Sequence, residues 1–329
     1  MTKTVALYAP AYDAFRSEID ALGLDIAVLT FDADGKLYRD GTEIAAEQAV
    51  IDYVWLSNFI SRDKAQEPVF DLLLRAKSID VVQTFNAGLD HPVYGKLKEK
   101  GTRVCNSSAQ AMAISEYLVG QVLNIFQPFA QQRQLQAEKT WQITPFREIW
   151  RTNWLIVGYG PIGRETARKV KAFGASTTVI RRSPETNELV DRAGTLDQIG
   201  AYVGDADVIV LACPLNAQTR GFANKEFFSK VKEGAILLNI GRGPLIDDAA
   251  LMAALDEGRL ATAVLDVFHT EPLPADDPLW SHPKVRMTCH TSFAGSGGAT
   301  RWKELFLDNL PRYVRGEALV NEVHPDDIP

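Results

Sequence analysis

Residues 154–183 constrain the fold of this chain more than any other segment. Their sequence, WLIVGYGPIGRETARKVKAFGASTTVIRRS, alternates an apolar strand, a glycine-bearing turn, an amphipathic helix and a second strand. In such a βαβ unit Gly158 allows the tight turn, Gly160 lets the backbone approach a pyrophosphate, and Gly163 lets helix and strand pack closely. The phosphates then lie at the helix N-terminus, where unpaired N–H groups point at them. The segment therefore predicts a dinucleotide site; the alternative is a glycine-rich turn that only packs.

The end of the second strand indicates which dinucleotide binds. At the position eighteen residues beyond Gly163, where an acidic residue would hold the ribose 2′-hydroxyl of NAD, the chain has Arg181, followed by Arg182 and Ser183. Two guanidinium groups and a hydroxyl can hydrogen-bond a 2′-phosphate, whereas a carboxylate would repel it. We therefore expect NADP(H) to be preferred, with NAD(H) as a possible second cofactor. A solvated basic loop is the alternative interpretation.

The rest of the chain also alternates short apolar strands with helical patterns, which is typical of parallel sheets covered by helices. A length of 329 residues suits two domains. We expect an α/β fold with a Rossmann doubly wound parallel sheet at 105–293 and a second, flavodoxin-like α/β domain, with a cleft between them. The second domain is expected to be discontinuous, 1–104 and 294–329, because a tail of about 35 residues is too short to fold alone.

Apolar periodicity predicts several individual elements. A long, mostly buried helix is expected over 109–129, followed by a surface helix and loop that lead to the strand at 154. The second half of the chain provides strands for a six-stranded sheet and a helix near 195–201. The tail is expected to form one amphipathic helix over 301–313 that packs on the first domain.

Composition excludes several classes of protein. Hydrophobic residues make up 46% and charged residues 23%, with a net charge of −7, which indicates neither a nucleic-acid footprint nor a membrane-binding patch. The N-terminus fits no signal peptide, and no apolar run approaches the roughly 18 residues that span a bilayer. Three cysteines without ligand-spaced histidines argue against a disulfide scaffold and against a metal site. We therefore expect the protein in the reducing cytoplasm.

Three polar residues follow predicted strands in the second half of the chain. Arg242 follows AILLNIG, Glu271 follows LDVFHT, and His290 follows VRMTC. Ligands of open α/β sheets lie at the carboxyl ends of the strands. There, Arg242 can hold a 2-keto acid, His290 can exchange the hydroxyl proton, and Glu271 can favour the protonated imidazole. The alternatives are a surface or capping arginine, a solvated glutamate and a structural histidine.

The motifs around these residues resemble those of the D-2-hydroxyacid dehydrogenase family. NIGRGPLID, AVLDVFHTEP and the His290 segment occur in the family's order and at similar spacing, and the resemblance covers nearly the whole chain. It implies that Arg242, Glu271 and His290 form the catalytic set and that Asp266 holds the nicotinamide carboxamide. The chain departs from the family at Cys289, where proline is common, and at Cys213, where an apolar residue is usual.

The resemblance also implies the remaining binding residues. In FNAGLDHP the backbone N–H groups of Ala87, Gly88 and Leu89 are expected to bind the substrate carboxylate together with Arg242, and Asn-Ala-Gly after a strand can itself form an anion-binding turn. An ordinary turn is the alternative. The expected cofactor-binding residues are Gly158, Gly160, Pro161, Ile162, Gly163, Arg181, Arg182, Ser183, Cys213, Pro214, Thr219, Ile240, Gly241 and Asp266.

The expected function is therefore an oxidoreductase that transfers a hydride between NADP(H) and a small 2-keto acid, with glyoxylate and hydroxypyruvate as the favoured substrates. The arginine pair and the short architecture are similar to the glyoxylate/hydroxypyruvate reductase branch of the family. A homodimer is implied by the same resemblance. A dinucleotide-sensing interaction protein on the same fold, similar to the C-terminal-binding corepressors, is the alternative from another functional class.

Overall fold

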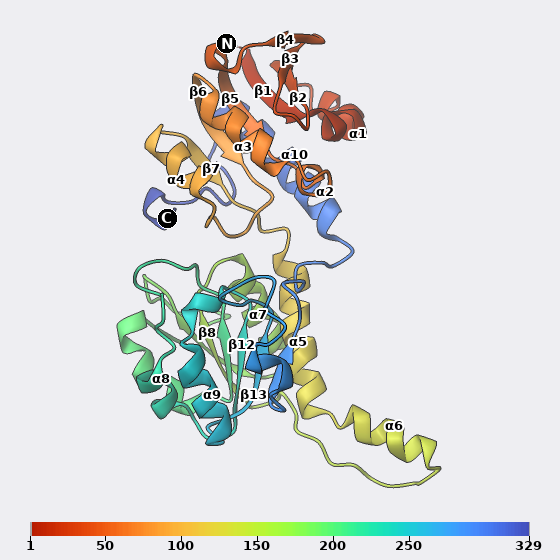
Figure 1. Cartoon of the computed structure of the whole chain (residues 1–329), viewed down its shortest axis with the longest axis vertical. Coiled ribbons are helices and arrows are strands. Elements are labelled where there is room, and N and C mark those ends of the chain that lie inside the picture. The colour runs from red at the N-terminus through yellow and green to blue at the C-terminus, as the bar shows by residue number, and fades with distance from the viewer. Residues whose placement is uncertain (1, 329) are drawn as a thin grey trace. The chain divides into compact units, whose positions relative to one another are not determined.

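The computed structural model describes residues 2–328, which fold as two compact α/β units. Unit 1 comprises Met1–Gln110 and Ser296–Pro329, and unit 2 comprises Ala111–Gly295. The chain therefore passes from one unit to the other twice, and unit 1 is discontinuous in sequence (Figure 1). The domain boundaries expected from the sequence, after residues 104 and 293, lie a few residues before these two crossings.

Unit 1 contains a seven-stranded sheet in the order β4-β3-β2-β1-β5-β6-β7. The five strands from β2 to β7 in this order are parallel, with the flavodoxin-like order 2-1-3-4-5, and the hairpin β3-β4 adds an antiparallel edge. The strands are β1 (Lys3–Tyr8), β2 (Ile26–Phe31), β3 (Leu37–Arg39), β4 (Thr42–Ile44), β5 (Val50–Trp55), β6 (Ser78–Gln83) and β7 (Arg103–Cys105). The helices are α1 (Ala9–Asp20), α2 (Phe59–Arg62), α3 (Gln66–Arg75), α4 (Pro92–Glu99) and α10 (Gly298–Arg315).

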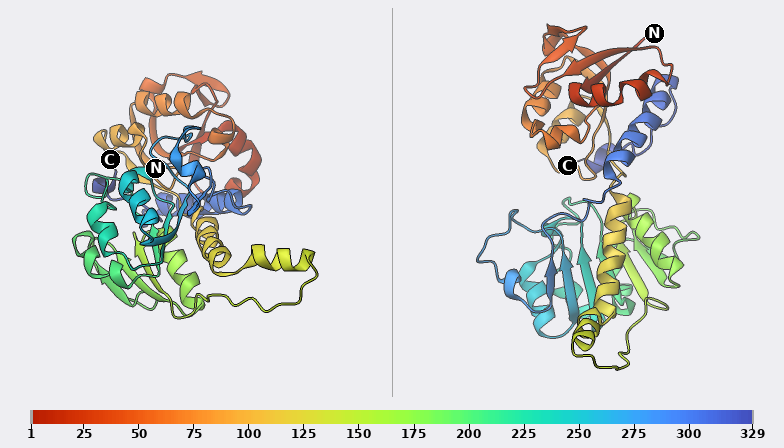
Figure 2. Two further views of the ribbon diagram at one scale, coloured as in Figure 1. Left: turned by 60° about the horizontal axis from the view of Figure 1, so that its bottom comes forward. Right: turned by 90° about the vertical axis from the view of Figure 1, so that its right-hand side faces the viewer.

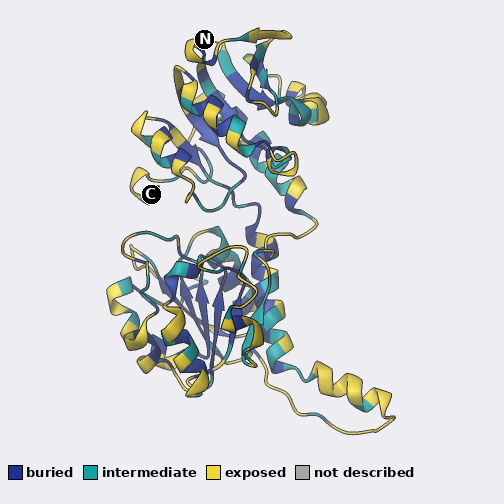
Figure 3. Cartoon of the chain, in the orientation of Figure 1, coloured by how far each residue is buried: buried dark blue, intermediate teal, exposed yellow. Residues whose placement is uncertain are grey.

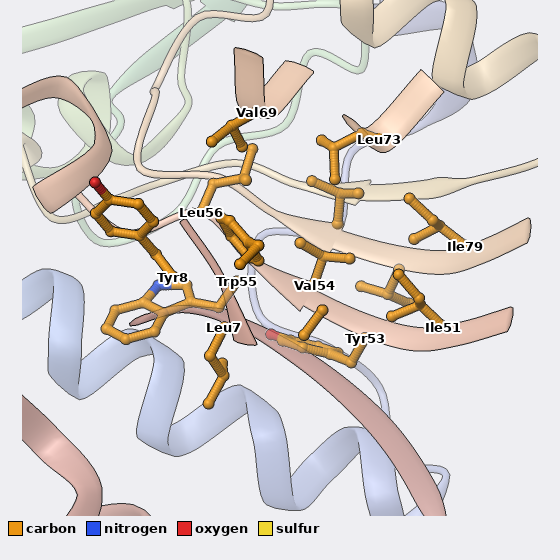
Figure 4. Close-up of a cluster of buried hydrophobic side chains, with 14 of the residues drawn as sticks. Leu7, Tyr8, Ile51, Tyr53, Val54, Trp55, Leu56, Val69, Leu73 and Ile79 are labelled. Carbon is orange, nitrogen blue, oxygen red and sulfur yellow. The ribbon is translucent and has the colours of Figure 1, made fainter. Parts of the chain in front are cut away.

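The C-terminal helix α10 completes the hydrophobic core of unit 1. Its Phe306 ring stacks on the Trp55 ring of β5, with the centroids 4.0 Å apart and the planes 3° from parallel. Figure 4 shows Trp55 among the buried aliphatic side chains of the central strands, with Val69 and Leu73 of α3 on the other side of the sheet. The tail thus closes one face of a sheet whose strands lie some 250 residues earlier in the chain.

Unit 2 contains a fully parallel seven-stranded sheet in the order β10-β9-β8-β11-β12-β13-β14. This is the doubly wound Rossmann order with one more strand at the far edge. The strands are β8 (Asn153–Val157), β9 (Ser176–Ile180), β10 (Arg192–Gly194), β11 (Val208–Leu211), β12 (Ala235–Asn239), β13 (Leu260–Leu265) and β14 (Val285–Met287). The helices are α5 (Ala111–Phe126), α6 (Phe129–Ala137), α7 (Pro161–Ala172), α8 (Lys225–Lys230) and α9 (Asp248–Asp256).

Both faces of the unit 2 sheet are buried, because successive residues of its strands alternate between two hydrophobic clusters. In β11, Val208 and Val210 pack with α5 and α7, whereas Ile209 and Leu211 pack with α8 and α9. This alternation explains why the central strands read as unbroken apolar runs in the sequence. Two views of the unit show helices on both faces of the sheet (Figures 1 and 2).

Three sequence-based expectations for unit 2 were wrong in detail. The sheet has seven strands, not six, because the short segment Arg192–Gly194, which has no apolar run, pairs with β9. The long helix ends at Phe126 instead of 129, since Pro128 has no N–H and disfavours helical geometry in the residue before it. The expected helix near 195–201 is a 3-10 helix, Leu196–Ala201, with a capping box between Thr195 and Gln198.

The polar segment after α5 forms the surface helix and loop that the sequence predicts. Helix α6 has no buried residue, and the loop from its end to residue 150 returns to the sheet (Figure 3). Large apolar side chains are nevertheless exposed along this segment: Trp141 is 102% exposed and Ile143 is 87% exposed. We call residues 127–150 the arm. Within residues 2–328 no helix is both long and apolar enough to cross a bilayer.

A buried carboxylate attaches the base of the arm to the unit 2 sheet. Asp207, with a side chain only 8% exposed, accepts hydrogen bonds from Arg147 (2.8 Å), Lys232 (2.7 Å) and the N–H of Asn153 (2.8 Å). Burial by itself raises the pKa of Asp207, but the hydrogen bonds from Lys232 and Asn153 and the charge of Arg147 hold it below the ordinary value. The ionised carboxylate is therefore favoured in the folded state.

We predict that Asp207→Asn lowers the free energy of unfolding by about 1.5–3 kcal/mol at pH 7, the cost of losing hydrogen bonds to a charged group. Because the folded-state pKa is depressed, the stabilisation is present above the unfolded-state pKa of about 3.9 and is lost as pH falls through the folded-state value. Urea unfolding of both proteins at several pH values measures the difference, which should shrink toward acid.

Asp205→Asn is the matched control for this prediction. Asp205 also pairs with an arginine, Arg192 at 3.1 Å, but its side chain is 59% exposed. Exposed ion pairs contribute only about 0.2–1 kcal/mol. Equal losses for the two variants, or a difference that does not depend on pH, would contradict the role assigned to Asp207.

Candidate active site

The glycine-bearing turn between β8 and α7 is built from backbone contacts that a side chain would prevent. Gly158 has φ +102°, and a Cβ there would lie 2.6 Å from the Ala212 carbonyl oxygen. A Cβ on Gly163 would lie 2.1 Å from the Gly158 carbonyl oxygen. These two positions therefore require glycine for reasons internal to the fold.

Gly160 differs from its two neighbours in the motif. A Cβ on Gly160 would meet nothing within 4 Å, and its φ is not positive, so the protein itself does not require glycine there. Pro161 begins α7 without an N–H, and among residues 2–328 the N–H groups of Ile162 and Gly163 find no acceptor. The turn thus presents open space and free donors at the positive end of a 12-residue helix, which fits the pyrophosphate of a dinucleotide.

Arginine residues surround Tyr159 in the same turn. The Arg181 guanidinium lies over the Tyr159 ring at 5.4 Å from its centroid, and Arg164 lies over it at 5.8 Å. Arg182 and Ser183 follow on the exposed loop after β9. The aromatic ring therefore holds two guanidinium groups near the position where the adenosine ribose of a bound dinucleotide is expected.

The remaining expected cofactor residues lie at the carboxyl ends of β11 and β12. The turn after β11 contains Cys213 and Pro214 and is closed by Thr219, whose hydroxyl donates to the Pro214 carbonyl at 2.8 Å. Gly241, after Ile240, lies against this turn, because a Cβ there would be 3.0 Å from the Cys213 carbonyl oxygen. Burial raises the pKa of the Cys213 thiol to about 12, so this cysteine stays protonated and unreactive. Cys289 is exposed.

His290 and Glu271, which the sequence predicts to act together, form a hydrogen-bonded pair. His290 Nδ1 and Glu271 Oε2 are 2.7 Å apart, and the other carboxylate oxygen of Glu271 accepts the N–H of Phe268 at 2.9 Å. Both carboxylate oxygens are therefore engaged, and the imidazole orientation is fixed through Nδ1. The side chains are 42% and 36% exposed, and within residues 2–328 the Nε2 atom of His290 has no hydrogen-bond partner.

Asp266 holds the His290 segment in place. Its buried carboxylate accepts hydrogen bonds from the Thr288 hydroxyl (2.6 Å) and from the N–H groups of Thr291 and Ser292 (2.8 and 3.1 Å). Its carbonyl oxygen accepts the His290 N–H at 2.8 Å. These bonds surround a residue with φ +50°, an uncommon conformation for histidine, and so stabilise it. Among the described residues, Oδ2 accepts only from Ser292, which leaves a lone pair for the carboxamide that the family resemblance assigns to it.

The loop of Arg242 packs directly on the loop of Glu271. A Cβ on Gly243 would lie 2.0 Å from the carbonyl carbon of Phe268 and 2.3 Å from the N of His269, so the two backbones touch at this glycine. His269 adds a second link, because its Nε2 lies 2.9 Å from the Ile246 carbonyl oxygen. Arg242 itself donates to the Gly241 carbonyl at 2.7 Å. The loops of Arg242 and Glu271 therefore form one packed assembly.

The substrate-binding residues expected from the sequence lie in unit 1. Ala87, Gly88 and Leu89 follow β6 in an irregular loop, and among residues 2–328 their three N–H groups donate to no protein acceptor. Ala87 and Gly88 are partly exposed, whereas the Leu89 side chain is buried. Free backbone donors on an ordered turn are the feature that an anion-binding nest requires.

The sequence did not identify four residues that shape this arrangement: Tyr159, Gly243, Thr288 and Tyr117. The Tyr117 hydroxyl lies 2.8 Å from the Thr288 hydroxyl, which in turn donates to Asp266, so α5 is linked to the histidine segment. Only Gly243 carried a signal, as the second glycine beside an arginine at a strand end. The others depend on contacts between residues far apart in the chain. Within residues 2–328, no group of side chains that could hold a metal ion is present.

We predict that Gly243→Ala separates the two catalytic loops while the fold survives. The added methyl group must displace the backbone of Phe268 and His269, and a misplacement of about 1 Å near reacting groups can lower kcat/KM on the order of 100-fold. Steady-state kinetics and thermal melting of the variant measure the two effects.

Gly258→Ala is the comparison, since it lies in the same unit and a Cβ there meets nothing within 4 Å, although its φ of +79° adds backbone strain. Gly258→Ala should lose stability and keep its activity. Full activity of Gly243→Ala would show that the loops tolerate separation.

Comparison with known proteins gives one consistent result. Residues 119–292 match the family model described as D-isomer specific 2-hydroxyacid dehydrogenase, NAD binding domain. The chain is 30% identical over 263 residues to glyoxylate/hydroxypyruvate reductase A of Citrobacter koseri, an alignment that covers 76% of this chain and 82% of the relative.

Solved structures agree with this match. The fold is similar to a D-isomer specific 2-hydroxyacid dehydrogenase family protein of Aeromonas salmonicida, with a TM-score of 0.74 and 27% identity over 99% of this chain and 100% of the other. An NADPH-dependent glyoxylate/hydroxypyruvate reductase of Sinorhizobium meliloti, solved with NADP and sulfate, is similar in fold at a TM-score of 0.74 and 24% identity, with 100% of both chains covered.

Proposed function

Because the chain belongs to the D-isomer specific 2-hydroxyacid dehydrogenase family, we propose that it is an NADPH-dependent reductase of glyoxylate and hydroxypyruvate. The observation that carries the reaction type is the hydrogen-bonded pair His290–Glu271, together with the packing of the Glu271 loop against the loop of Arg242. Both loops lie at the carboxyl edge of the sheet that carries the glycine-bearing turn. Family membership makes the protein an oxidoreductase that uses NAD(P) and 2-hydroxy acids.

The bound nicotinamide supplies or accepts the hydride, and the protein supplies the binding and the proton. Arg242 holds the substrate carboxylate or carbonyl and withdraws charge from the carbonyl as an alkoxide develops. His290 donates a proton from Nε2 to that oxygen during reduction and removes it during oxidation. Glu271, through its hydrogen bond at Nδ1, fixes the orientation of the imidazole. The N–H groups of Ala87, Gly88 and Leu89 bind the substrate carboxylate.

The preference for NADP(H) over NAD(H) is part of this proposal. It is supported by the Arg181 guanidinium, held over Tyr159 at the end of β9, with Arg182 and Ser183 following on an exposed loop. No carboxylate stands at these positions to bind a 2′-hydroxyl or to repel a 2′-phosphate. The small substrates are supported by the name of the Citrobacter koseri relative.

We expect wild-type protein to oxidise NADPH faster than NADH at equal concentrations with glyoxylate or hydroxypyruvate, and more slowly with pyruvate or phenylpyruvate. Arg181→Asp should reduce the ratio of kcat/KM for NADPH over NADH on the order of 100-fold, since it removes charge-assisted hydrogen bonds and adds repulsion. Initial rates at 340 nm and the two cofactor KM values measure this.

Arg168→Asp is the matched charge change on the exposed part of α7, where Arg168 pairs with Glu165 at 3.6 Å, and it should leave the ratio unchanged. Glu271→Gln should retain cofactor binding and lose most of kcat. Tight NADPH binding without turnover of any of the four acids would contradict the reductase proposal and favour a dinucleotide-sensing protein.

A cytoplasmic homodimer completes the proposal, and the arm supports the dimer. Besides Trp141 and Ile143, the arm exposes Phe146 (52%) and Trp150 (54%), a run of apolar side chains that a monomer would leave in water. Helix α6 has no buried residue within its own unit, so its surface is available to a partner. A second copy of the chain is the simplest such partner, because most soluble oligomers are homo-oligomers.

We predict that the wild type sediments as a dimer and that the double variant Trp141→Ser, Ile143→Ser is a monomer at micromolar concentration. Loss of two fully exposed apolar side chains from an interface removes contacts without disturbing the core of unit 2. Analytical ultracentrifugation measures the mass. Val50→Ser, at a 56% exposed position of unit 1, is the control and should stay dimeric. A monomeric wild type would remove the dimer from the proposal.

A further inference from the structure

The loop that follows β6 in unit 1 is fixed through its carbonyl groups. The Phe85 carbonyl accepts hydrogen bonds from both the Gln110 amide and the Trp302 indole N–H, the latter at 3.1 Å. The Asn86 carbonyl accepts the N–H of Ser107 at 2.8 Å. The Ala87 carbonyl accepts the Asn106 amide at 2.8 Å. Three consecutive carbonyl groups of the loop are therefore held by unit 1.

Most N–H groups of the same loop, in contrast, have no hydrogen-bond acceptor within residues 2–328. The N–H of Asn86 donates to the Thr84 hydroxyl at 3.2 Å, but within residues 2–328 those of Ala87, Gly88 and Leu89 have no acceptor. Most backbone N–H and C=O groups of a folded protein are paired with the backbone, a side chain or water. With the carbonyls of residues 85–87 occupied and the N–H groups of residues 87–89 without an acceptor among the described residues, the loop presents a positive potential on its N–H side.

We propose that Trp302, Gln110 and Asn106 are positioning residues for substrate binding, because they hold the carbonyls of 85–87 so that the following N–H groups stay directed away from the protein and available to a carboxylate. The proposal rests on the function proposed above, in which Ala87, Gly88 and Leu89 bind the substrate anion. It assigns to three side chains outside the expected site a part in substrate affinity.

The three donor side chains lie close to the two points where the chain passes between the units. Asn106 and Gln110 lie just before the first crossing of the chain out of unit 1, and Trp302 lies in the first turns of α10, just after the second crossing. Trp302 and Phe85 are 217 residues apart in sequence. The substrate loop is thus hydrogen-bonded to both segments of unit 1 that lead into unit 2. Helix α10 therefore contributes to the site as well as to the core.

A merely structural role is the competing explanation, since buried carbonyls need partners whatever their neighbours do. The two explanations differ in what a lost donor changes. If the donors only stabilise unit 1, their removal lowers thermal stability and leaves substrate KM unchanged. If they position the N–H groups, substrate affinity falls while cofactor affinity is unaffected, because the cofactor residues lie in unit 2.

The test uses the full chain and the variant Trp302→Phe, which removes the indole N–H and keeps an aromatic ring against the core. We expect KM for glyoxylate and hydroxypyruvate, and the inhibition constant of oxalate, to rise about tenfold, with KM for NADPH unchanged. Asn106→Ala, which removes the donor to the Ala87 carbonyl, should act in the same direction. Oxalate reports anion binding without chemistry, so a shared rise locates the effect in binding.

Lys98→Met is the matched control. The Lys98 ammonium also donates to backbone carbonyls of the C-terminal segment, at 2.7 Å to Ile328, and its hydrogen bonds within the described part of the chain do not include the 85–89 loop. This variant should change neither the substrate KM nor the oxalate inhibition constant. An unchanged substrate KM in both Trp302→Phe and Asn106→Ala, or a parallel rise in KM for NADPH, would overturn the proposal.

Amide hydrogen exchange separates failure of this inference from failure of the proposed function. In wild-type protein, oxalate should slow exchange at residues 87–89, and Trp302→Phe should weaken that protection at equal oxalate concentration. If the wild type turns over no keto acid but shows this pattern, the reductase proposal fails and the positioning role stands. If oxalate gives no protection at 87–89 in the wild type, the positioning role fails whatever the turnover.

Discussion

The parallel pairing of the strands in unit 2 is the constraint on which the candidate site depends. Because β8, β9, β11, β12, β13 and β14 all run in one direction, the segments that follow them emerge at one edge of the sheet. The glycine-bearing turn, the Cys213 turn and the loops of Arg242, Glu271 and His290 are these segments. Both faces of the sheet are covered by apolar side chains, so the polar groups of the candidate site lie at the ends of the strands.

At that edge, backbone contacts bring the loops together. Gly158 and Gly163 let the first turn lie against a neighbouring strand end and its own helix, and Gly243 lets two catalytic loops touch. In each case a Cβ would have to occupy the place of a backbone atom. Side chains then add to these backbone contacts. Glu271 bonds to the His290 ring, and Asp266 bonds to the residues on either side of His290. The positions of these loops relative to one another therefore depend mainly on the absence of a Cβ at the glycines.

Unit 1 makes its contribution by a different physical means. The loop proposed to bind the substrate has no charged side chain at Ala87, Gly88 or Leu89, and within residues 2–328 the N–H groups of these three residues have no acceptor. Such donors are effective only if the backbone is fixed, since a mobile loop would satisfy them internally or with water. The hydrogen bonds to its carbonyls supply that rigidity, and they come from both chain segments that join unit 1 to unit 2.

Much of this protein could be predicted from its sequence alone. The βαβ segment, the two α/β folds, the flavodoxin-like partner and the order of Arg242, Glu271 and His290 follow from local patterns, because apolar periodicity and glycine requirements act within a few residues. That Glu271 lies beside His290 was also expected, and the structure adds the hydrogen bond between them. These features needed no knowledge of long-range contacts beyond the rule that parallel strands end at one edge.

Only the tertiary structure decided the rest. The seventh strand, Arg192–Gly194, has no apolar signature and exists because β9 offers it a partner. The contact of Gly243 with Phe268, the support of His290 by Asp266 and the bond from Trp302 to Phe85 join residues that are 24 to 217 positions apart. A sequence pattern reports what one segment can bury, whereas these contacts depend on how two segments meet, which is fixed only when the sheets and helices have packed.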